Sequence, residues 1–241
     1  MANINCNNGI ISSCNDCLQR KYSPLNALSK EELNILNSKR KSQHVKKGTP
    51  IFISGEYTKG LICLSTGKAK ISIEDKLGNS QIVSLKKEVD FLGLHELMSD
   101  SKYRTNATAI TDVSVCIIDK REFYSVIKNN ADFSIKIIKI LSNELGRIER
   151  RTIKLTQKYM RVRLAETIFE LTNIYGYVKK EERLLNVEMK RKELANLSNM
   201  TTANLIRTLS VFVKEGIVKT KRRKIWIKNI KALKKVTQEV S

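Results

Sequence analysis

The segment from Thr201 to Lys214 places hydrogen-bonding and apolar side chains on opposite sides of a predicted helix. At 100° per residue, the apolar arc holds Leu205, Leu209 and Phe212, flanked by Ile206 and Val213. The opposite arc holds Ala203, Asn204, Arg207, Ser210 and Lys214, and the predicted N-cap is Thr201 or Thr202. We therefore expect one side of this helix to be buried and the other to be available to a ligand.

The polar arc has the chemistry to bind a DNA duplex. The major groove admits one α-helix, and residues at the N-terminal end of that helix reach the base edges. Arg207 can donate two hydrogen bonds to guanine, and Asn204 suits adenine or a phosphate. The hydroxyls of Thr201 and Thr202, beside the helix N-terminus, suit a phosphate oxygen. The alternative is a solvated polar face on a structural helical hairpin.

Two neighbouring elements favour DNA binding. Residues 191–198 predict a short preceding helix with Leu194 and Leu197 facing inward, which makes the pair a helix-turn-helix candidate. Residues 217–229 predict a β-hairpin whose basic tip could bind phosphates. The candidate DNA contacts are Lys192, Thr201, Thr202, Ala203, Asn204, Arg207, Lys221, Arg222, Arg223 and Lys224.

Positive charge is concentrated in the same part of the chain. The 241 residues carry 45 Lys and Arg against 24 Asp and Glu, and residues 158–241 hold 20 of the basic and 8 of the acidic ones. Such a basic domain indicates a polyanionic partner. Nucleic acid fits better than a membrane surface, because no basic amphipathic anchor or lipidation motif is present. The alternative is that the charge only maintains solubility.

Export and catalysis are both disfavoured by the sequence. The start of the chain lacks a basic segment followed by an apolar core, and no run of 18 apolar residues occurs. We therefore expect a cytoplasmic protein without a membrane partner. The two histidines, His44 and His95, fall in separate predicted elements, and no phosphate-loop or nucleophile–base pattern accompanies them. We expect that the protein is not an enzyme.

A long helix precedes the DNA-binding elements. Its heptad positions a and d are filled by Ile138, Leu141, Leu145, Ile148, Thr152 and Leu155. The polar flanks favour an exposed helix that pairs with a second copy of the chain, giving a homodimer. The alternative is a helix packed on its own domain. The next segment, "RVRLAETIFELTNIYG", predicts an amphipathic helix that ends at Gly176.

The remaining elements predict an α+β protein with an N-terminal antiparallel β-roll. From about residue 44 to 120, β-rich runs such as "GLICLS" and "AKISIE" alternate with glycine-containing turns, of which "KLGNS" is one. Before them, "ALSKEELNILNSK" predicts a helix with a Ser29–Glu32 capping box. The expected parts are a cysteine-containing tail at 1–24, a β-roll sensor domain at 25–130, a dimerisation helix at 131–157 and a winged helix-turn-helix domain at 158–241.

Nearly the whole chain, about residues 24–235, resembles bacterial transcription regulators of the Crp/Fnr family. The runs "KKGTPIFISGE", "GLICLSTGKAKI" and "DFLGLHEL" are similar to the family's cyclic-nucleotide-binding-like roll, and "KLTQKYMRVRLAETIFEL" to its hinge and first DNA-domain helix. "MKRKELANLSNMTTANLIRTLSVFVKEGIV" resembles its helix-turn-helix and is the most specific match. The resemblance implies a homodimer that binds a two-fold site in double-stranded DNA. Whether it touches RNA polymerase stays open.

The roll departs from the family pattern for cyclic nucleotides. In members that bind them, a glycine is followed by a Glu that binds the ribose, but here Gly93 is followed by Leu94 and the nearby Glu96 is two positions off. The phosphate clamp is only partly present, because Arg104-Thr105 is followed by Asn106 instead of a small residue. We therefore expect a redox, gas or small-molecule signal at the roll and no binding of cyclic AMP or GMP.

The predicted recognition helix also departs from the family. Many members read bases with a Glu four residues before the Arg, whereas here Ala203 stands in that position relative to Arg207. The Ala203 methyl group can only make an apolar contact, for instance to a thymine methyl. The competing function class is a ligand-binding regulatory module that acts through protein partners or binds nucleic acid non-specifically.

The oxygen-sensing branch of the family implies one further site. That branch holds an iron–sulfur cluster on three N-terminal cysteines and one in the roll, which are matched here by Cys6, Cys14, Cys17 and Cys116. Four thiolates suit such a cluster. However, the C-x₇-C-x₂-C spacing differs from that branch, and Cys63 and Cys116 lie in apolar runs typical of core cysteines. A redox-active C-x-x-C pair, zinc, or structural cysteines are the alternatives.

Overall fold

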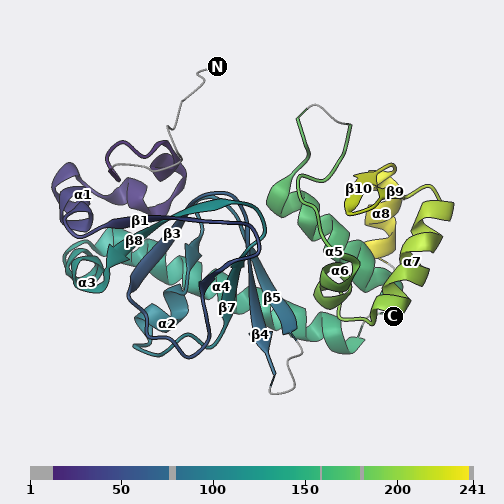
Figure 1. Ribbon diagram of the computed structural model, residues 1–241, viewed down its shortest axis with the longest axis horizontal. Coiled ribbons are helices and arrows are strands. Elements are labelled where there is room, and N and C mark those ends of the chain that lie inside the picture. The colour runs from purple at the N-terminus through teal and green to yellow at the C-terminus, as the bar shows by residue number, and fades with distance from the viewer. Residues whose placement is uncertain (1–12, 76–79, 158, 180–181, 239–241) are drawn as a thin grey trace. The chain divides into compact units, whose positions relative to one another are not determined.

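The computed structural model describes residues 13–75, 80–157, 159–179 and 182–238 (Figure 1). The chain forms two compact units, one that runs to Leu145 and one that begins at Gly146, with Ser80–Ile82 grouped with the second. The first unit holds two β-sheets and flanking helices, and the second holds helices and one hairpin. The α+β class is therefore confirmed.

Two four-stranded sheets with antiparallel pairing form the roll, in the strand orders β1-β8-β3-β6 and β2-β7-β4-β5. The strands are β1 Lys41–Val45, β2 Pro50–Phe52, β3 Gly60–Thr66, β4 Ala69–Glu74, β5 Ser80–Lys86, β6 Phe91–Leu92, β7 Asn106–Ala109 and β8 Val113–Asp119. The β-rich runs thus form strands as predicted. Residues 76–79 of the predicted "KLGNS" turn lie outside the described residues.

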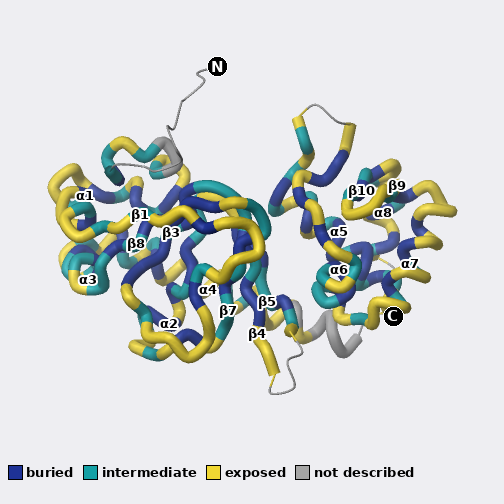
Figure 2. Tube along the Cα trace, in the orientation of Figure 1, coloured by how far each residue is buried: buried dark blue, intermediate teal, exposed yellow. Residues whose placement is uncertain are grey.

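Buried positions recur along the strands of the roll (Figure 2), and their side chains form two apolar clusters. Leu64 of β3 belongs to a first cluster, in which the rings of Phe52 and Tyr103 stack with their centroids 3.8 Å apart. Leu61 and Ile118 belong to a second cluster, shared with the helices of this unit. Because successive residues of a strand face opposite sides, β3 and β8 can serve both clusters.

Five of the described helices contribute side chains to the second cluster. They are the 3₁₀ helix Pro24–Ala27 and the α-helices α1 Lys30–Asn37, α2 Leu94–Met98, α3 Lys120–Asn129 and α4 Ala131–Gln157, of which the last continues past Leu145. A further 3₁₀ helix, Leu18–Tyr22, precedes them. The predicted Ser29–Glu32 capping box is present at the start of α1. Cys14 is buried in this cluster, so part of the predicted N-terminal tail belongs to the folded core.

The second unit contains the predicted helix pair and hairpin. Its elements are α5 Met160–Tyr175, α6 Arg191–Leu197, α7 Thr202–Lys214, β9 Val218–Lys221, β10 Lys224–Ile227 and α8 Ile230–Thr237. Helix α5 ends as predicted at Gly176, whose φ of 63° is easily adopted by glycine. Helix α8, which the sequence did not reveal, packs against α5 and buries Leu233 and Val236. In the ranges described, no helix is sufficiently long and apolar to span a bilayer.

Candidate nucleic-acid interface and thiol-lined cavity

Helix α7 has the two-sided character that its sequence predicts. Leu205, Leu209 and Phe212 are buried. The opposite side exposes Thr202, Ala203, Arg207, Ser210 and Lys214, while Asn204 is half-buried. Thr201 is the N-cap, since its hydroxyl accepts a hydrogen bond from the backbone N–H of Asn204 at 3.2 Å. The exposed side therefore presents short side chains in the first turn and Arg207 one turn later.

A tight turn joins α6 to α7. Asn199 has a φ of 49°, a left-handed conformation in which Asn is enriched. The backbone N–H of Met200 donates to the carbonyl of Ala195 at 3.0 Å, and the Ser198 hydroxyl donates to that of Leu194 at 2.9 Å. These bonds keep the linker short, as a helix-turn-helix requires. Lys192 of α6 is exposed.

Arg161, which the sequence analysis did not single out, supports the other end of α7. Its guanidinium donates to the two carboxylate oxygens of Glu215 at 2.9 and 2.6 Å, and lies 5.1 Å from the centroid of the Phe212 ring. Bidentate pairs of this kind fix geometry as well as contribute energy. The start of α5 therefore orients the C-terminal end of α7, a relation that no sequence spacing would show.

The hairpin carries its predicted basic tip. Strands β9 and β10 are antiparallel with Lys221 opposite Lys224, and Arg222 in the turn has a φ of 53°. Lys221, Arg222 and Arg223 are exposed, and Lys224 is half-buried. Three basic side chains at this tip are therefore accessible to a polyanion.

Ile206, which the sequence placed at the flank of the buried arc, lies on the accessible part of α7. It is 50% exposed, and residues three apart on a helix are neighbours, so it adjoins Ala203. The apolar surface at Ala203 is thus larger than the sequence suggested. Apolar contacts of this kind can distinguish thymine by its methyl group.

Four cysteines line one cavity in the first unit: Cys14, Cys17, Cys63 and Cys116. Cys63 and Cys116 are directly opposite each other on β3 and β8, so their side chains share one face of the sheet. The backbone N–H of Cys14 donates to Oδ1 of Asn37 at 2.8 Å, which ties this segment to α1. Cys63, which was not among the predicted ligands, thus lines the cavity, and the predicted ligand Cys6 lies outside the described residues.

The four thiols have different electrostatic surroundings. Burial raises the pKa of Cys14 from 9.0 to about 11, although the charge of Arg40 acts in the opposite direction. Burial also raises the pKa of Cys63 well above its usual value. Arg40 donates a hydrogen bond from Nη1 to the sulfur of Cys116 at 2.8 Å.

Four thiols are the donors that an iron–sulfur cluster requires. In the described part of the chain, no three Cys, His, Asp or Glu side chains are grouped closely enough to share a metal ion. Cys6, one of the four predicted ligands, lies outside the described residues, so the cluster stays a prediction.

The positions at which the sequence departs from the cyclic-nucleotide pattern are all described. Leu94 and Tyr103 are both buried, and a side chain at Gly93 would collide with the Tyr103 ring, so this ring fills the space next to the glycine. Glu96 is buried as well, whereas Arg104 is exposed. The first cluster takes apolar side chains from both sheets. That the roll does not bind cyclic AMP or GMP stays a prediction.

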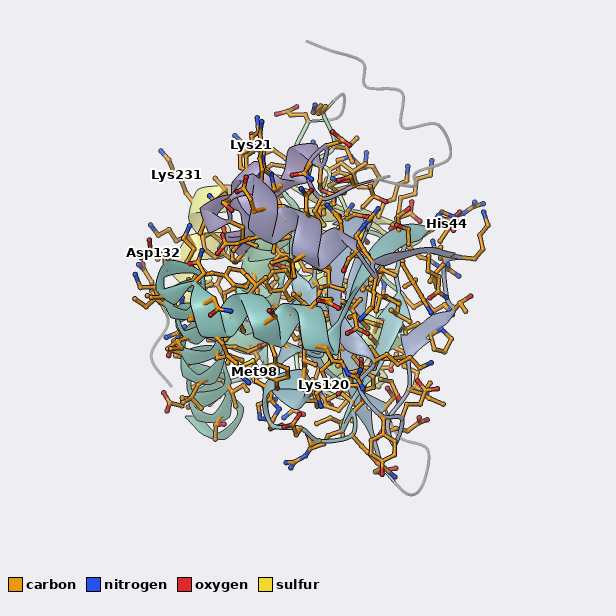
Figure 3. The ribbon with its side chains drawn as sticks, turned by 90° about the vertical axis from the view of Figure 1, so that its left-hand side faces the viewer. Lys21, His44, Met98, Lys120, Asp132 and Lys231 are labelled. Carbon is orange, nitrogen blue, oxygen red and sulfur yellow. The ribbon has the colours of Figure 1, made fainter. Side chains whose placement is uncertain are left out.

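His44 lies near two groups that sequence spacing did not connect with it. Its Nδ1 is 3.4 Å from the Ser114 hydroxyl, and its Nε2 is 3.9 Å from an Asp112 oxygen, at the surface of the first unit (Figure 3). Asp112 also accepts hydrogen bonds from the Lys47 N–H and the Lys46 ammonium, which together lower its pKa. The carboxylate is thus held by lysine partners, and the histidine contacts are long for a catalytic triad.

The predicted seam on α4 is partly exposed. Ile138, Leu145 and Ile148 are 60%, 58% and 59% exposed, whereas Leu141 packs half-buried on the second cluster. Thr152 is exposed, and the side chain of Leu155 lies outside those described. The homodimer seam stays a prediction.

Comparison with known proteins agrees with this architecture. Residues 42–130 match the model of the cyclic nucleotide-binding domain, and residues 162–236 match that of the Crp-like helix-turn-helix domain. The chain is 25% identical to electron transport regulator A of Shewanella oneidensis, over 91% of this chain and 88% of that protein. It is 24% identical to the fumarate and nitrate reduction regulatory protein of Yersinia pestis, over 93% and 90%.

Solved structures share the fold. A Crp/Fnr-family regulator from Eubacterium rectale superposes with a TM-score of 0.73 at 22% identity, covering 91% of this chain and all of that one. FixK2 from Bradyrhizobium japonicum has a TM-score of 0.74 at 20% identity, covering 84% and 99%. Together with the two domain matches, these relatives show that the chain belongs to the Crp/Fnr family of DNA-binding transcription regulators.

Proposed function

We propose that this regulator is a homodimer that reads a two-fold DNA site with α7 and responds to a signal at the thiol-lined cavity. The observation that carries the proposal is the exposed arc of α7, where Arg207 follows a first turn of short side chains. A helix with this arrangement can enter the major groove and place its arginine against a guanine. Two copies would read the two halves of a symmetric site.

The remaining DNA contacts divide into base-reading and phosphate-binding groups. Ala203 and Ile206 offer apolar surface to a thymine methyl. Thr201, Thr202, Asn204 and Lys192 lie at or near the helix N-termini, where phosphate oxygens are favoured. The basic tip from Lys221 to Lys224 adds phosphate contacts that carry no sequence information.

Exposed aliphatic side chains on α4 support the homodimer. Ile138, Leu145 and Ile148 recur at heptad positions and are each more than half exposed. A contiguous apolar stripe of this kind marks an interaction surface. A second copy of α4 would bury it and bring two recognition helices together for one site.

The thiol-lined cavity is the proposed site of the signal. It measures about 40 Å³, which leaves room for a few water-sized molecules and not for a nucleotide. A gas, a peroxide or direct thiol oxidation therefore suits it. We place the protein in the cytoplasm, where its DNA and RNA polymerase are found.

Selection of binding sites from a random DNA pool tests the proposal. We expect a two-fold consensus, and two chains per selected duplex by sedimentation. Without a consensus, sequence-specific reading fails, and the protein is a non-specific binder or a module that acts through protein partners. Cyclic AMP and cyclic GMP should produce no shift in the melting temperature, while a peroxide should change affinity for the selected duplex.

A further inference from the structure

Lys86 is the one buried basic side chain among the described residues. It ends β5 and is 9% exposed. Its ammonium lies 2.8 Å from Oε1 of Glu144 on α4, and the two side chains are 11% and 26% exposed. A buried ammonium needs such a partner because leaving water is costly. The pair therefore joins the edge of a roll sheet to the helix that carries the predicted seam.

The heptad pattern places Glu144 at the margin of that seam. Counting from Ile138 as position a, Glu144 is a g residue and Glu149 is an e residue. In the proposed dimer both DNA-binding units face one duplex, so the two α4 helices run parallel. In a parallel pair, a g residue approaches the e residue that follows five positions later on the partner helix. Glu144 of one copy thus approaches Glu149 of the other.

We infer that Lys86 strengthens the homodimer by neutralising Glu144 at this margin. Two like-charged carboxylates across a seam oppose pairing. With Lys86 in place, Glu144 is already paired inside its own chain, and the exposed Glu149 of a second copy meets a neutralised group. The interface that a second copy recognises therefore includes a residue of the roll, and moving β5 would weaken the dimer. This inference rests on the proposed homodimer.

Dilution experiments by sedimentation velocity test it, using the full chain. Lys86→Met should raise the dimer dissociation constant roughly three- to tenfold, because the unfavourable contact occurs twice in a two-fold dimer. Lys87→Met is the matched control, since Lys87 is an exposed lysine one residue further on and should have no such effect. Higher salt should reduce the Lys86→Met defect, because it screens the repulsion.

A second substitution separates repulsion from damage to the roll. Glu149→Gln in the Lys86→Met background alters only an exposed residue and should restore dimerisation. A monomeric wild-type chain at all concentrations would overturn the homodimer itself. Two outcomes would overturn the role of Lys86 while leaving the homodimer in place. One is a dimeric wild type whose Lys86→Met variant dimerises equally well. The other is a Lys86→Met defect that Glu149→Gln does not rescue.

Discussion

The DNA-binding face and the thiol-lined cavity are built in opposite ways. The face consists of α7 and the hairpin that follows it, so most of its chemistry lies within one short stretch of chain. The cavity takes Cys14 and Cys17 from the N-terminal segment, Cys63 from β3 and Cys116 from β8. Single residues of the DNA-binding face can be substituted without loss of the fold, because the buried side of α7 holds the helix in place. The cavity depends on anchors such as Asn37 and Arg40 that bring distant segments together.

The largest expected effect is on the DNA-binding face. Arg207→Ala should cost about 1–3 kcal/mol per half-site on the selected duplex and relax discrimination at one base pair, because a bidentate contact to guanine is lost. Equilibrium titrations against duplexes with single substitutions measure both quantities. Lys214→Ala, further along the same exposed arc, is the control and should leave discrimination intact. An equal loss on every sequence would show that Arg207 does not read bases.

Ala203→Glu should change which base is preferred without destroying the face. A carboxylate at this position can accept a hydrogen bond from cytosine N4, which the methyl group cannot. We expect a new preference worth about 1–2 kcal/mol at one base pair, revealed by repeating the site selection with the variant. Since Ala203 is exposed, the fold should be unaffected, as a melting curve would confirm. An unchanged consensus would place Ala203 away from the bases.

The same contrast explains what could be predicted from the sequence. The Ser29–Glu32 capping box and the two arcs of α7 follow from local spacing, and both are present. The place of Cys63 in the cavity depends on the β3–β8 register, which joins residues far apart in the chain. The pairing of Lys86 with Glu144 depends on packing in the same way. Local sequence patterns therefore predict local geometry, whereas the residues that line a cavity are known only from the tertiary structure.

Asn37→Leu should open the thiol cavity while leaving the DNA-binding face unchanged. It removes the acceptor of the Cys14 N–H and the donor to the Ser13 hydroxyl, contacts of 2.8 and 3.0 Å. An unsatisfied buried group costs about 1–3 kcal/mol, so alkylation of Cys14 at pH 8 should rise roughly tenfold. Mass spectrometry of the labelled peptide gives the rate. Asn34→Leu is the control, because it removes the solvent-exposed hydrogen bond from the Asn15 side chain and leaves the Cys14 N–H paired with Asn37.

The pH dependence of Cys14 alkylation gives a second test of the role of Asn37. Only the thiolate reacts, and burial raises the pKa of Cys14 to about 11, so in the wild type its alkylation rate should keep rising with pH up to that value. In Asn37→Leu the midpoint should move down towards 9.0, the value of this thiol without burial. The same midpoint in both proteins would show that Asn37 does not hold Cys14 in the cavity.

The smallest effect is expected at the tip of the hairpin. Arg223→Ala should weaken binding to all duplexes alike, by about threefold per half-site at low salt, and should reduce the salt slope by about one per half-site, because a phosphate contact is lost and no base contact changes. Lys59→Ala removes an exposed charge from the first unit and serves as the control. Arg223→Ala and Arg207→Ala each delete one positive charge, so any difference between them on substituted duplexes isolates base reading from electrostatic attraction. A loss confined to one sequence would instead make Arg223 a reader of bases or of DNA shape.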